Sequence, residues 1–270
     1  PPTYASIESG NMEIRKIFLG STPVRVLVLD FDGTLSTLRH GWERVMADMM
    51  VDYLGEESQG EIAQYIEQSA GIQTIHQMKW LRDSILAKTG SALDAWAYKD
   101  EYNHHLMQDV ERKTLELQSG KAKAEQYLMA GTIPFLKNMR ARGLKMHIAS
   151  GTDQEDVQRE AALLGIAPLV DSVSGAPFRQ ENCSKERVLE ELIAGQGFHG
   201  PQVCVIGDGR VEIALGVRHG ARTLGLASDE EKGRGLNPVK RSRLVEADAE
   251  AIAGDFLDLD TLINWMNLKG

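Results

Sequence analysis

Short apolar runs that end at a polar residue or a glycine recur along this chain, and this pattern constrains the fold most. The first run covers residues 25–29 and ends in the segment Asp30-Phe31-Asp32-Gly33-Thr34. Val- and Leu-rich runs of this length, bounded by turn residues, are typical of buried strands. Later runs have the same character, although the one at 169–173 is weaker: 145–150, 169–173, 202–207, 221–226 and 249–253.

Helical patterns separate these runs. They cover residues 132–142, 153–164, 184–194 and 212–219, and a glycine follows each of them directly. Glycine is common just past the end of a helix because it adopts the left-handed conformation without steric cost. Strands that alternate with helices predict an α/β fold, in which helices cover both faces of a parallel sheet.

One long segment between the first and second predicted strands interrupts this alternation. It contains no convincing strand, and helical patterns recur instead at 42–54, 56–68, 75–88 and 92–107, the last continuing toward 127. We therefore expect an N-terminal extension, a catalytic core and an all-helical cap domain inserted after the first strand. Their boundaries are 1–22 for the extension, 23–36 with 132–270 for the core, and 37–131 for the cap.

The amino-acid composition limits the kinds of partner molecule that we expect. The 270 residues carry a formal net charge of -9 and a pI of about 5.3, so we expect no nucleic-acid partner and no membrane partner. No apolar run approaches the ~18 residues of a membrane span, and no secretory signal is apparent at the N-terminus. Cys183 and Cys204 are expected to be reduced thiols. These features predict a cytoplasmic protein.

Polar residues follow the apolar runs at the points where the predicted strands end. Because ligands bind at the carboxyl ends of the strands in a parallel sheet, we expect these residues to converge on one site. The candidates are Asp30 and Asp32 after the first run, Ser150, Gly151 and Thr152 after the second, Asp208 and Glu212 after the fourth, and Lys185 at a predicted helix start. A cation at a helix start is unfavourable to the helix dipole, which favours a functional role for Lys185.

The chemistry of this set is coherent. Carboxylates gathered at one sheet edge repel one another unless a cation joins them, and oxygen ligands suit a hard ion such as Mg²⁺. The Asp30 carboxylate can attack phosphorus, and Asp32 can protonate the leaving oxygen and later deprotonate water. Ser150 and the backbone N–H groups near Gly151 can hold phosphoryl oxygens, while Lys185 neutralises developing charge. The set predicts phosphoryl transfer from a small-molecule phosphate ester.

A family resemblance rests on these same residues. The segment Asp30-Phe31-Asp32-Gly33-Thr34, then Ser150, Lys185 and Gly207-Asp208-Gly209, resembles the ordered motifs of the haloacid dehalogenase-like hydrolase superfamily. The resemblance covers about residues 24–255. It implies a Rossmann-like three-layer core, and a cap in this position resembles that of phosphoglycolate-phosphatase-like members.

The resemblance also implies roles. Asp30 would be the nucleophile and a Mg²⁺ ligand, and Asp32 the general acid and base, with its backbone carbonyl on the metal. Ser150 would bind the phosphate, Lys185 would balance its charge, and Asp208 would be a further metal ligand. Many members carry an aspartate at the position of Glu212, so this longer side chain is expected to reach the metal through water.

Several functions fit these motifs. The leading one is a Mg²⁺-dependent phosphatase that works through an aspartyl phosphate on Asp30. Asp32 argues against a dehalogenase, which needs no carboxyl there, and against a phosphonate hydrolase, which would replace it. A phosphomutase acting on a sugar phosphate shares all the motifs and stays open. So does a catalytically silent regulatory protein that binds a phosphate ligand.

Several polar residues outside the motifs have an ordinary structural interpretation. His104 and His105 are adjacent, so they point to different faces of a helix and are expected at the surface. Four residues in or near the cap are expected to serve at the surface or in packing rather than at the substrate: Arg39, His40, Trp42 and Lys79. The loop 228–235 is interpreted either as a segment near the site or as a solvated loop.

Overall fold

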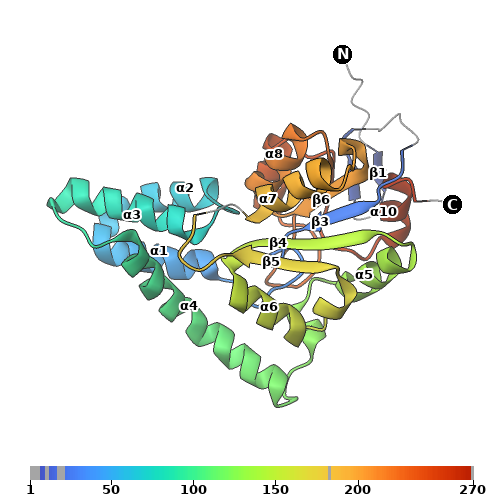
Figure 1. Ribbon diagram of the computed structural model, residues 1–270. Coiled ribbons are helices and arrows are strands. Elements are labelled where there is room, and N and C mark those ends of the chain that lie inside the picture. The colour runs from blue at the N-terminus through green and yellow to red at the C-terminus, as the bar shows by residue number, and fades with distance from the viewer. Residues whose placement is uncertain (1–6, 10–11, 17–21, 182–183, 269–270) are drawn as a thin grey trace.

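The computed structural model describes residues 7–9, 12–16, 22–181 and 184–268, and these build a helix-covered sheet with a helical cap (Figure 1). Strands of the described residues form one eight-stranded sheet in the order β1-β2-β8-β7-β6-β3-β4-β5. The strands are β1 Ile7–Ser9, β2 Met12–Ile14, β3 Val26–Leu29, β4 Lys145–Asp153, β5 Ser172–Ala176, β6 Val203–Gly207, β7 Arg222–Leu226 and β8 Ala251–Ala253. Strand β3 lies between β4 and β6 and runs parallel to both.

The helices of the core cover both faces of the sheet, as the alternation of strands and helices predicts. They are α5 Thr132–Ala141, α6 Gln154–Leu163, α7 Ser184–Glu190, α8 Arg210–Arg218, α9 Pro238–Glu246 and α10 Leu259–Trp265. Successive side chains of a strand point to opposite faces. Leu27 and Leu29 pack with α5, α6 and α10, whereas Val26 and Val28 pack with α7 and α8. The core is therefore a three-layer α/β sandwich.

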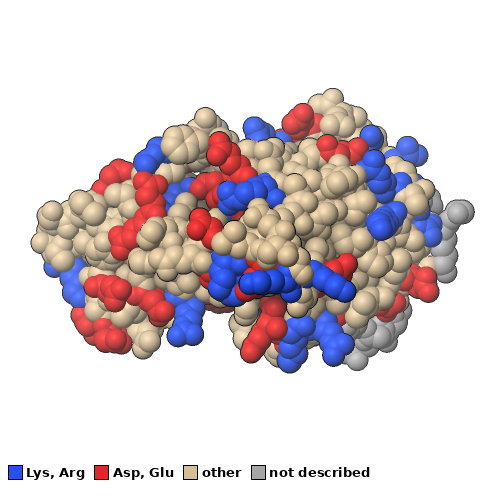
Figure 2. All heavy atoms as spheres, turned by 90° about the horizontal axis from the view of Figure 1, so that it is seen from below, with Lys and Arg blue, Asp and Glu red and all other residues tan. Residues whose placement is uncertain are grey.

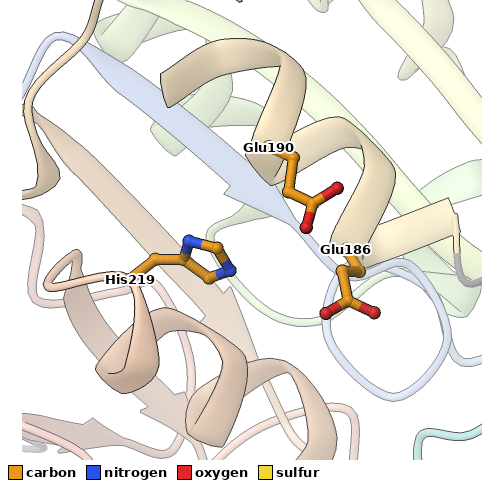
Figure 3. A group of neighbouring side chains, drawn as sticks. All are labelled: Glu186, Glu190 and His219. Carbon is orange, nitrogen blue, oxygen red and sulfur yellow. The ribbon is translucent and has the colours of Figure 1, made fainter. Parts of the chain in front are cut away.

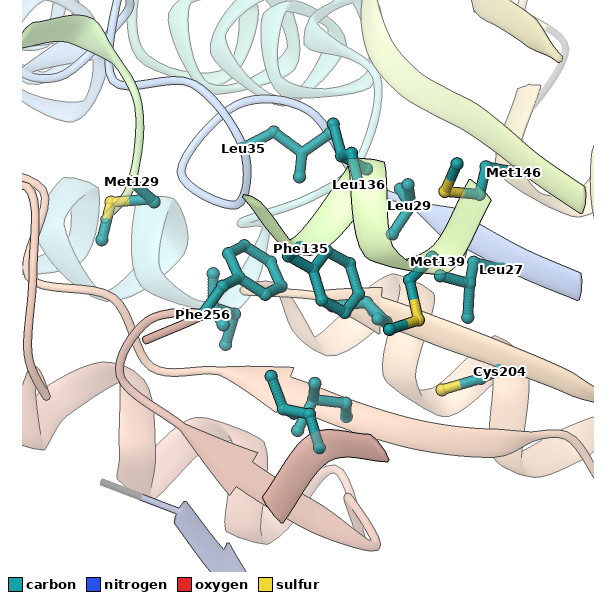
Figure 4. Packing of buried hydrophobic residues seen from close by; sticks show 14 of the residues in the cluster. Leu27, Leu29, Leu35, Met129, Phe135, Leu136, Met139, Met146, Cys204 and Phe256 are labelled. Atoms are coloured by element: carbon teal, nitrogen blue, oxygen red, sulfur yellow. The ribbon is translucent and has the colours of Figure 1, made fainter. Parts of the chain in front are cut away.

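The larger of the two core layers contains stacked aromatic side chains beneath the central strands (Figure 4). The rings of Phe135 on α5 and Phe256 after β8 stack with their centroids 4.5 Å apart. Both residues are fully buried, and Leu27, Leu29 and Cys204 pack in the same cluster. Cys204 is a free, buried thiol as expected, whereas Cys183 lies outside the described residues.

The N-terminal extension contributes to the sheet instead of standing apart from it. Strand β2 pairs antiparallel with β8, and β1 pairs antiparallel with β2. Met12 is buried in the same cluster as the central strands. The sequence did not predict these strands, because three residues are too few for an alternating pattern to stand out.

The cap is helical throughout, as expected, and has a core of its own. Its helices are α1 Trp42–Leu54, α2 Gln59–Gln68, α3 Thr74–Thr89 and α4 Ala95–Gln118. Met46, Ile62, Leu81 and Tyr98 lie in one buried cluster drawn from all four helices. Helix α4 is the longest and runs from the cap back toward α6 (Figure 1).

Two of the differences between the observed elements and the sequence patterns concern β5 and α7. The weak third run begins as a 3-10 turn, Ala167–Leu169, and the strand starts only at Ser172. Pro168 explains the delay, because proline suits the first turn of a helix and has no N–H for a sheet ladder. Helix α7 ends at Glu190 and continues as a π-helix, Glu191–Gly195.

Charge is mixed over the surface. On the face seen in Figure 2, acidic and basic side chains are interspersed over both the cap and the core. Among the helices of the described residues, none combines the length and the apolar character that a membrane crossing needs.

Candidate active site

The polar residues that follow the central strands meet in one cavity between the core and the cap. Asp30 and Asp32 follow β3, Ser150 lies on β4, and Asp208 follows β6. Because β4 and β6 flank β3, the carboxyl ends of these strands lie side by side. The predicted residues that line the cavity are Asp30, Asp32, Ser150, Gly151, Lys185 and Asp208. Glu212 lies directly behind them, next to Lys185.

Asp30 is buried beside Lys185. The Lys185 ammonium lies 3.1 Å from Asp30 Oδ1 and 3.0 Å from Glu212 Oε2. Burial raises the pKa of Asp30 well above its usual value, and the charge of Lys185 opposes this rise. Burial would lower the pKa of Lys185, but Asp30 and Glu212 outweigh it and raise that pKa, so the lysine stays charged. A charged lysine beside a carboxylate is the arrangement that transfer of an anionic group needs.

The two hydrogen bonds to the Asp32 carboxylate are both accepted by the same oxygen. Thr152 donates to Asp32 Oδ2 over 2.7 Å, and Ser150 donates to the same atom over 3.4 Å. Asp32 Oδ1 is buried and has no hydrogen-bond partner among the described residues, and the Nε of Arg39 lies 3.9 Å from it. Burial raises the pKa of Asp32, while Arg39 and Thr152 oppose the rise. A raised pKa favours the protonated form that a general acid needs.

An irregularity in strand β4, which carries Ser150 and Thr152, explains how these groups reach Asp32. The pairing of β4 with β5 shifts its register between Ala149 and Asp153, so the strand bulges at residues 150–152. Bulges re-aim side chains next to active sites. Here the bulge turns Ser150 and Thr152 toward Asp32. Thr152 was predicted to follow this strand together with Ser150 and Gly151, but the apolar run alone does not indicate the bulge that gives it a role.

Asp208 lies among cations that the sequence analysis did not single out. Lys240 on α9 places its ammonium 2.7 Å from Asp208 Oδ2 and 2.5 Å from Glu230. Arg243 donates to the Asp208 backbone carbonyl over 3.0 Å. Burial would raise the pKa of Asp208, but Lys240 and Arg243 outweigh it and lower that pKa. The Asp208 carboxylate is therefore kept ionised.

Lys240 could have been predicted from the sequence as Lys185 was, because each is a cation near the start of a helix. Asn237 caps α9 by accepting from the N–H groups of Val239 and Lys240, so Lys240 lies in the first helical turn. A cation is unfavourable there. The loop 228–235 joins it at the site, because Ser228 donates to the carbonyl of Gly33 and Glu230 pairs with Lys240.

The donor atoms fit a hard divalent cation. Carboxylate oxygens of Asp30, Asp208 and Glu212 all lie within 4.8 Å of one another. An all-oxygen set of this kind suits Mg²⁺. Glu212 is engaged on both sides, because Oε1 accepts from the N–H of Gly209 over 2.5 Å and Oε2 pairs with Lys185.

The cap closes the cavity with several of its own residues. The carbonyl of Gly71 accepts from the Lys185 ammonium over 3.4 Å, so the loop between α2 and α3 touches the predicted site directly. Lys99 and Asn103 on α4 contact Asp153 at the end of β4 over 2.5 and 3.1 Å. Besides Arg39, the cap residues that line the cavity are Trp42, Ala70, Gly71, Ile72, Thr74, Gln77, Lys99, Tyr102, Asn103 and Leu106.

The residues in or near the cap that were interpreted as surface or packing residues divide into two groups. Arg39 and Trp42 line the cavity, and Arg39 is buried in an ion pair with Glu160 over 2.6 Å. His40 is nearly half exposed and faces Glu230, and Lys79 pairs with Glu181. Neither His40 nor Lys79 lines the cavity.

The adjacent histidines of α4 are exposed, as expected. The rings of His104 and His105 lie 5.8 Å apart, and neither belongs to a cluster of possible metal ligands within the described ranges.

Comparison with known proteins agrees with this architecture. A family model described as haloacid dehalogenase-like hydrolase matches residues 24–220. No curated protein matches the chain. Several solved structures do. A phosphonoacetaldehyde hydrolase-like protein from Oleispira antarctica has a TM-score of 0.64 at 17% identity, covering 94% of this chain and 96% of its own.

Two further solved structures widen the range of activities among similar folds. A predicted phosphoglycolate phosphatase from Haemophilus somnus has a TM-score of 0.58 at 15% identity, covering 91% of this chain and 99% of its own. A beta-phosphoglucomutase from Clostridium difficile has a TM-score of 0.58 at 12% identity, covering 90% and 97%. Identities this low bear on the fold and leave the reaction to be argued from the site.

Proposed function

We propose that this chain, which belongs to the haloacid dehalogenase-like hydrolase family, is a Mg²⁺-dependent phosphatase of small-molecule phosphomonoesters. One observation carries the proposal: the Asp30 carboxylate, the Asp32 carboxyl and the Lys185 ammonium line a single cavity at the sheet edge. The family match and the phosphatases among the similar folds support a hydrolase that acts on phosphate esters.

The first half of the reaction transfers the phosphoryl group to Asp30. The carboxylate attacks phosphorus while the bond to the leaving oxygen breaks, and Asp32 gives that oxygen its proton. Asp32 Oδ1 suits this task because it is not held by any hydrogen bond of the described residues. Lys185, the Ser150 hydroxyl and the Gly151 N–H stabilise the charge on the transferred group.

The second half hydrolyses the aspartyl phosphate. Asp32, now ionised, takes a proton from a water molecule, and that water attacks phosphorus to release phosphate and free Asp30. The cap residues that line the cavity exclude bulk water from this step. Asp30, Asp208, the Asp32 backbone carbonyl and Glu212 through water would hold the Mg²⁺. When bound, the ion neutralises charge on the phosphoryl oxygens.

The test uses purified protein, a panel of phosphate esters and Mg²⁺. Wild-type protein is expected to release phosphate from at least one ester, and chelation of Mg²⁺ is expected to stop the release reversibly. Asp30→Asn is expected to lower kcat by about 10³-fold or more, because it removes the carboxylate that attacks phosphorus. Each factor of ten in kcat corresponds to ~1.4 kcal/mol of activation barrier.

The matched control is Asp109→Asn, a half-exposed aspartate of the cap that is far from the motifs in sequence and does not line the cavity. It is expected to keep wild-type kcat. Near-normal turnover by Asp30→Asn would contradict the proposed mechanism. No hydrolysis of any ester by the wild type would instead favour a regulatory protein that binds a phosphate ligand.

A phosphomutase is the second candidate, because a beta-phosphoglucomutase shares this fold and its motifs would be the same. The two reactions differ in the acceptor of the phosphoryl group, which is water in a phosphatase and a sugar hydroxyl in a mutase. A sugar phosphate labelled in its phosphoryl group separates them. Our proposal expects the label in inorganic phosphate, whereas a mutase would return it to the sugar at another position.

A further inference from the structure

A second group of possible metal ligands lies outside the catalytic cavity (Figure 3). Glu186 and Glu190 are one turn apart on α7, and His219 directly follows α8. A ring nitrogen of His219 and one oxygen from each glutamate all lie within 4.8 Å of one another. Figure 3 shows the imidazole facing the two glutamates from the neighbouring helix.

The donor set differs in kind from the catalytic one. Asp30, Asp208 and Glu212 offer only oxygen, which suits Mg²⁺, whereas this group adds an imidazole nitrogen. One histidine and two carboxylates are typical ligands of Zn²⁺ and of other divalent transition ions. Three protein ligands would leave a coordination position for water.

The local electrostatics also favour a cation. Glu186 and Glu190 are spaced i,i+4 on one helix, where like charges repel. The neighbouring Arg218 pairs with Glu186, but 62% of the arginine side chain is exposed. Exposed ion pairs contribute little stability, so the guanidinium can swing into solvent when a metal ion takes its place.

The position of the group links it to the active site. Helix α7 carries Lys185 one residue before Glu186, and helix α8 carries Glu212, whose carboxylate lies 3.0 Å from the Lys185 ammonium. An ion held between Glu186, Glu190 and His219 would join the same two helices. The α-helical part of α7 also gives way to a π-helix directly after Glu190, and such irregular turns are frequent at functional sites.

We propose that Glu186, Glu190 and His219 form a second metal site, specific for Zn²⁺ or a similar transition ion, that clamps α7 to α8. The site is separate from the Mg²⁺ ligands and does not depend on the proposed phosphatase activity. Its ion holds together the two helices that supply Lys185 and Glu212.

Calorimetric titration of chelator-treated protein with Zn²⁺, in saturating Mg²⁺ to fill the oxygen-only site, tests this proposal. The wild type is expected to bind Zn²⁺ and to gain thermal stability. His219→Ala and Glu190→Gln are expected to weaken Zn²⁺ binding by at least the roughly 10- to 100-fold that loss of an outer-shell partner costs a metal site. Arg218→Ala is expected to bind Zn²⁺ as tightly or more tightly, because it removes the competing guanidinium.

His104→Ala is the matched control, since His104 is an exposed histidine outside the cluster. It is expected to bind Zn²⁺ like the wild type. The proposal is overturned if the wild type binds no Zn²⁺ in excess Mg²⁺, or if His219→Ala keeps wild-type affinity. It is also overturned if Asp208→Asn, and not His219→Ala, abolishes the binding, because the ion would then occupy the catalytic donors.

Discussion

At the scale of single residues, the site is a set of buried charges that neutralise one another. Lys185 balances Asp30 and Glu212, and Lys240 balances Asp208 and Glu230. Buried carboxylates are costly without such partners. The residues that hold substrate and metal are therefore also residues on which folding depends.

Lys240→Met tests this dependence. The substitution removes the ammonium that Asp208 and Glu230 share and leaves Asp208 with Arg243 alone, so we expect the free energy of unfolding at pH 7 to fall by about 3–5 kcal/mol. The lowered pKa of Asp208 gives stability that is present above its unfolded-state pKa of ~3.9 and is lost as pH falls through the lower folded-state value. The difference between wild type and variant should therefore shrink in acid.

Denaturant unfolding at a series of pH values measures this difference. Lys232→Met is the matched control, because Lys232 pairs with Asp229 at the surface and is largely exposed. We expect that variant to unfold like the wild type at every pH. A Lys240→Met protein as stable as the wild type at neutral pH would show that the buried charges do not need this lysine.

At the scale of elements, the loop between α2 and α3 couples the cap to the site. Gly71 has φ +94°, and a Cβ built there would lie 2.8 Å from Glu212 Oε2. Gly90 at the end of α3 has a similar φ of +77°, but a Cβ there meets nothing within 4 Å. The two glycines share the backbone preference and differ only in contact with the site.

This pair gives a matched test. Gly71→Ala and Gly90→Ala should each lose about 1–2 kcal/mol of stability, because a side chain disfavours the left-handed conformation. Only Gly71→Ala should also lower kcat/KM, by about tenfold or more, since it pushes the cap loop away from Glu212. Steady-state kinetics with Mg²⁺ measures the effect, and equal kcat/KM values for the two variants would contradict it.

At this scale, the sequence predicts an element best where a helical or apolar pattern runs through the whole of that element. Helix α1 was expected at 42–54 and is found at Trp42–Leu54, and β3 and β6 differ from expectation by one residue at their starts. Strands β1 and β2 escaped prediction because each has three residues, and because β2 depends on pairing with β8 and β1 on pairing with β2. Pairing of that kind is tertiary and leaves no local pattern.

The same limit applies to the site. Residues at the strand ends were predictable, because chain order and the parallel sheet bring Asp30, Ser150 and Asp208 to one edge. The cap residues were not, because a helix offers several faces and composition does not say which one turns inward. Arg39 shows this well, since its partner Glu160 lies 121 positions away in the chain.

At the scale of the whole molecule, the cap and the core together make the reaction compartment. Asp30 lines the cavity directly after β3, and residues of the cap line the same cavity. The central claim is that a phosphoryl group passes from the substrate to Asp30 before water receives it. Asp32→Asn should accumulate that species, because it lacks the base for the second step, provided the leaving group needs no proton.

The decisive measurement is therefore a trapping experiment with Asp32→Asn and 4-nitrophenyl phosphate, whose leaving group departs without a proton. Borohydride reduces an acyl phosphate to an alcohol, so a phosphorylated Asp30 becomes homoserine, which peptide mass spectrometry locates. We predict a burst of 4-nitrophenolate together with homoserine at position 30, and neither without Mg²⁺. A burst that leaves Asp30 unmodified, or that labels another residue, would contradict this account.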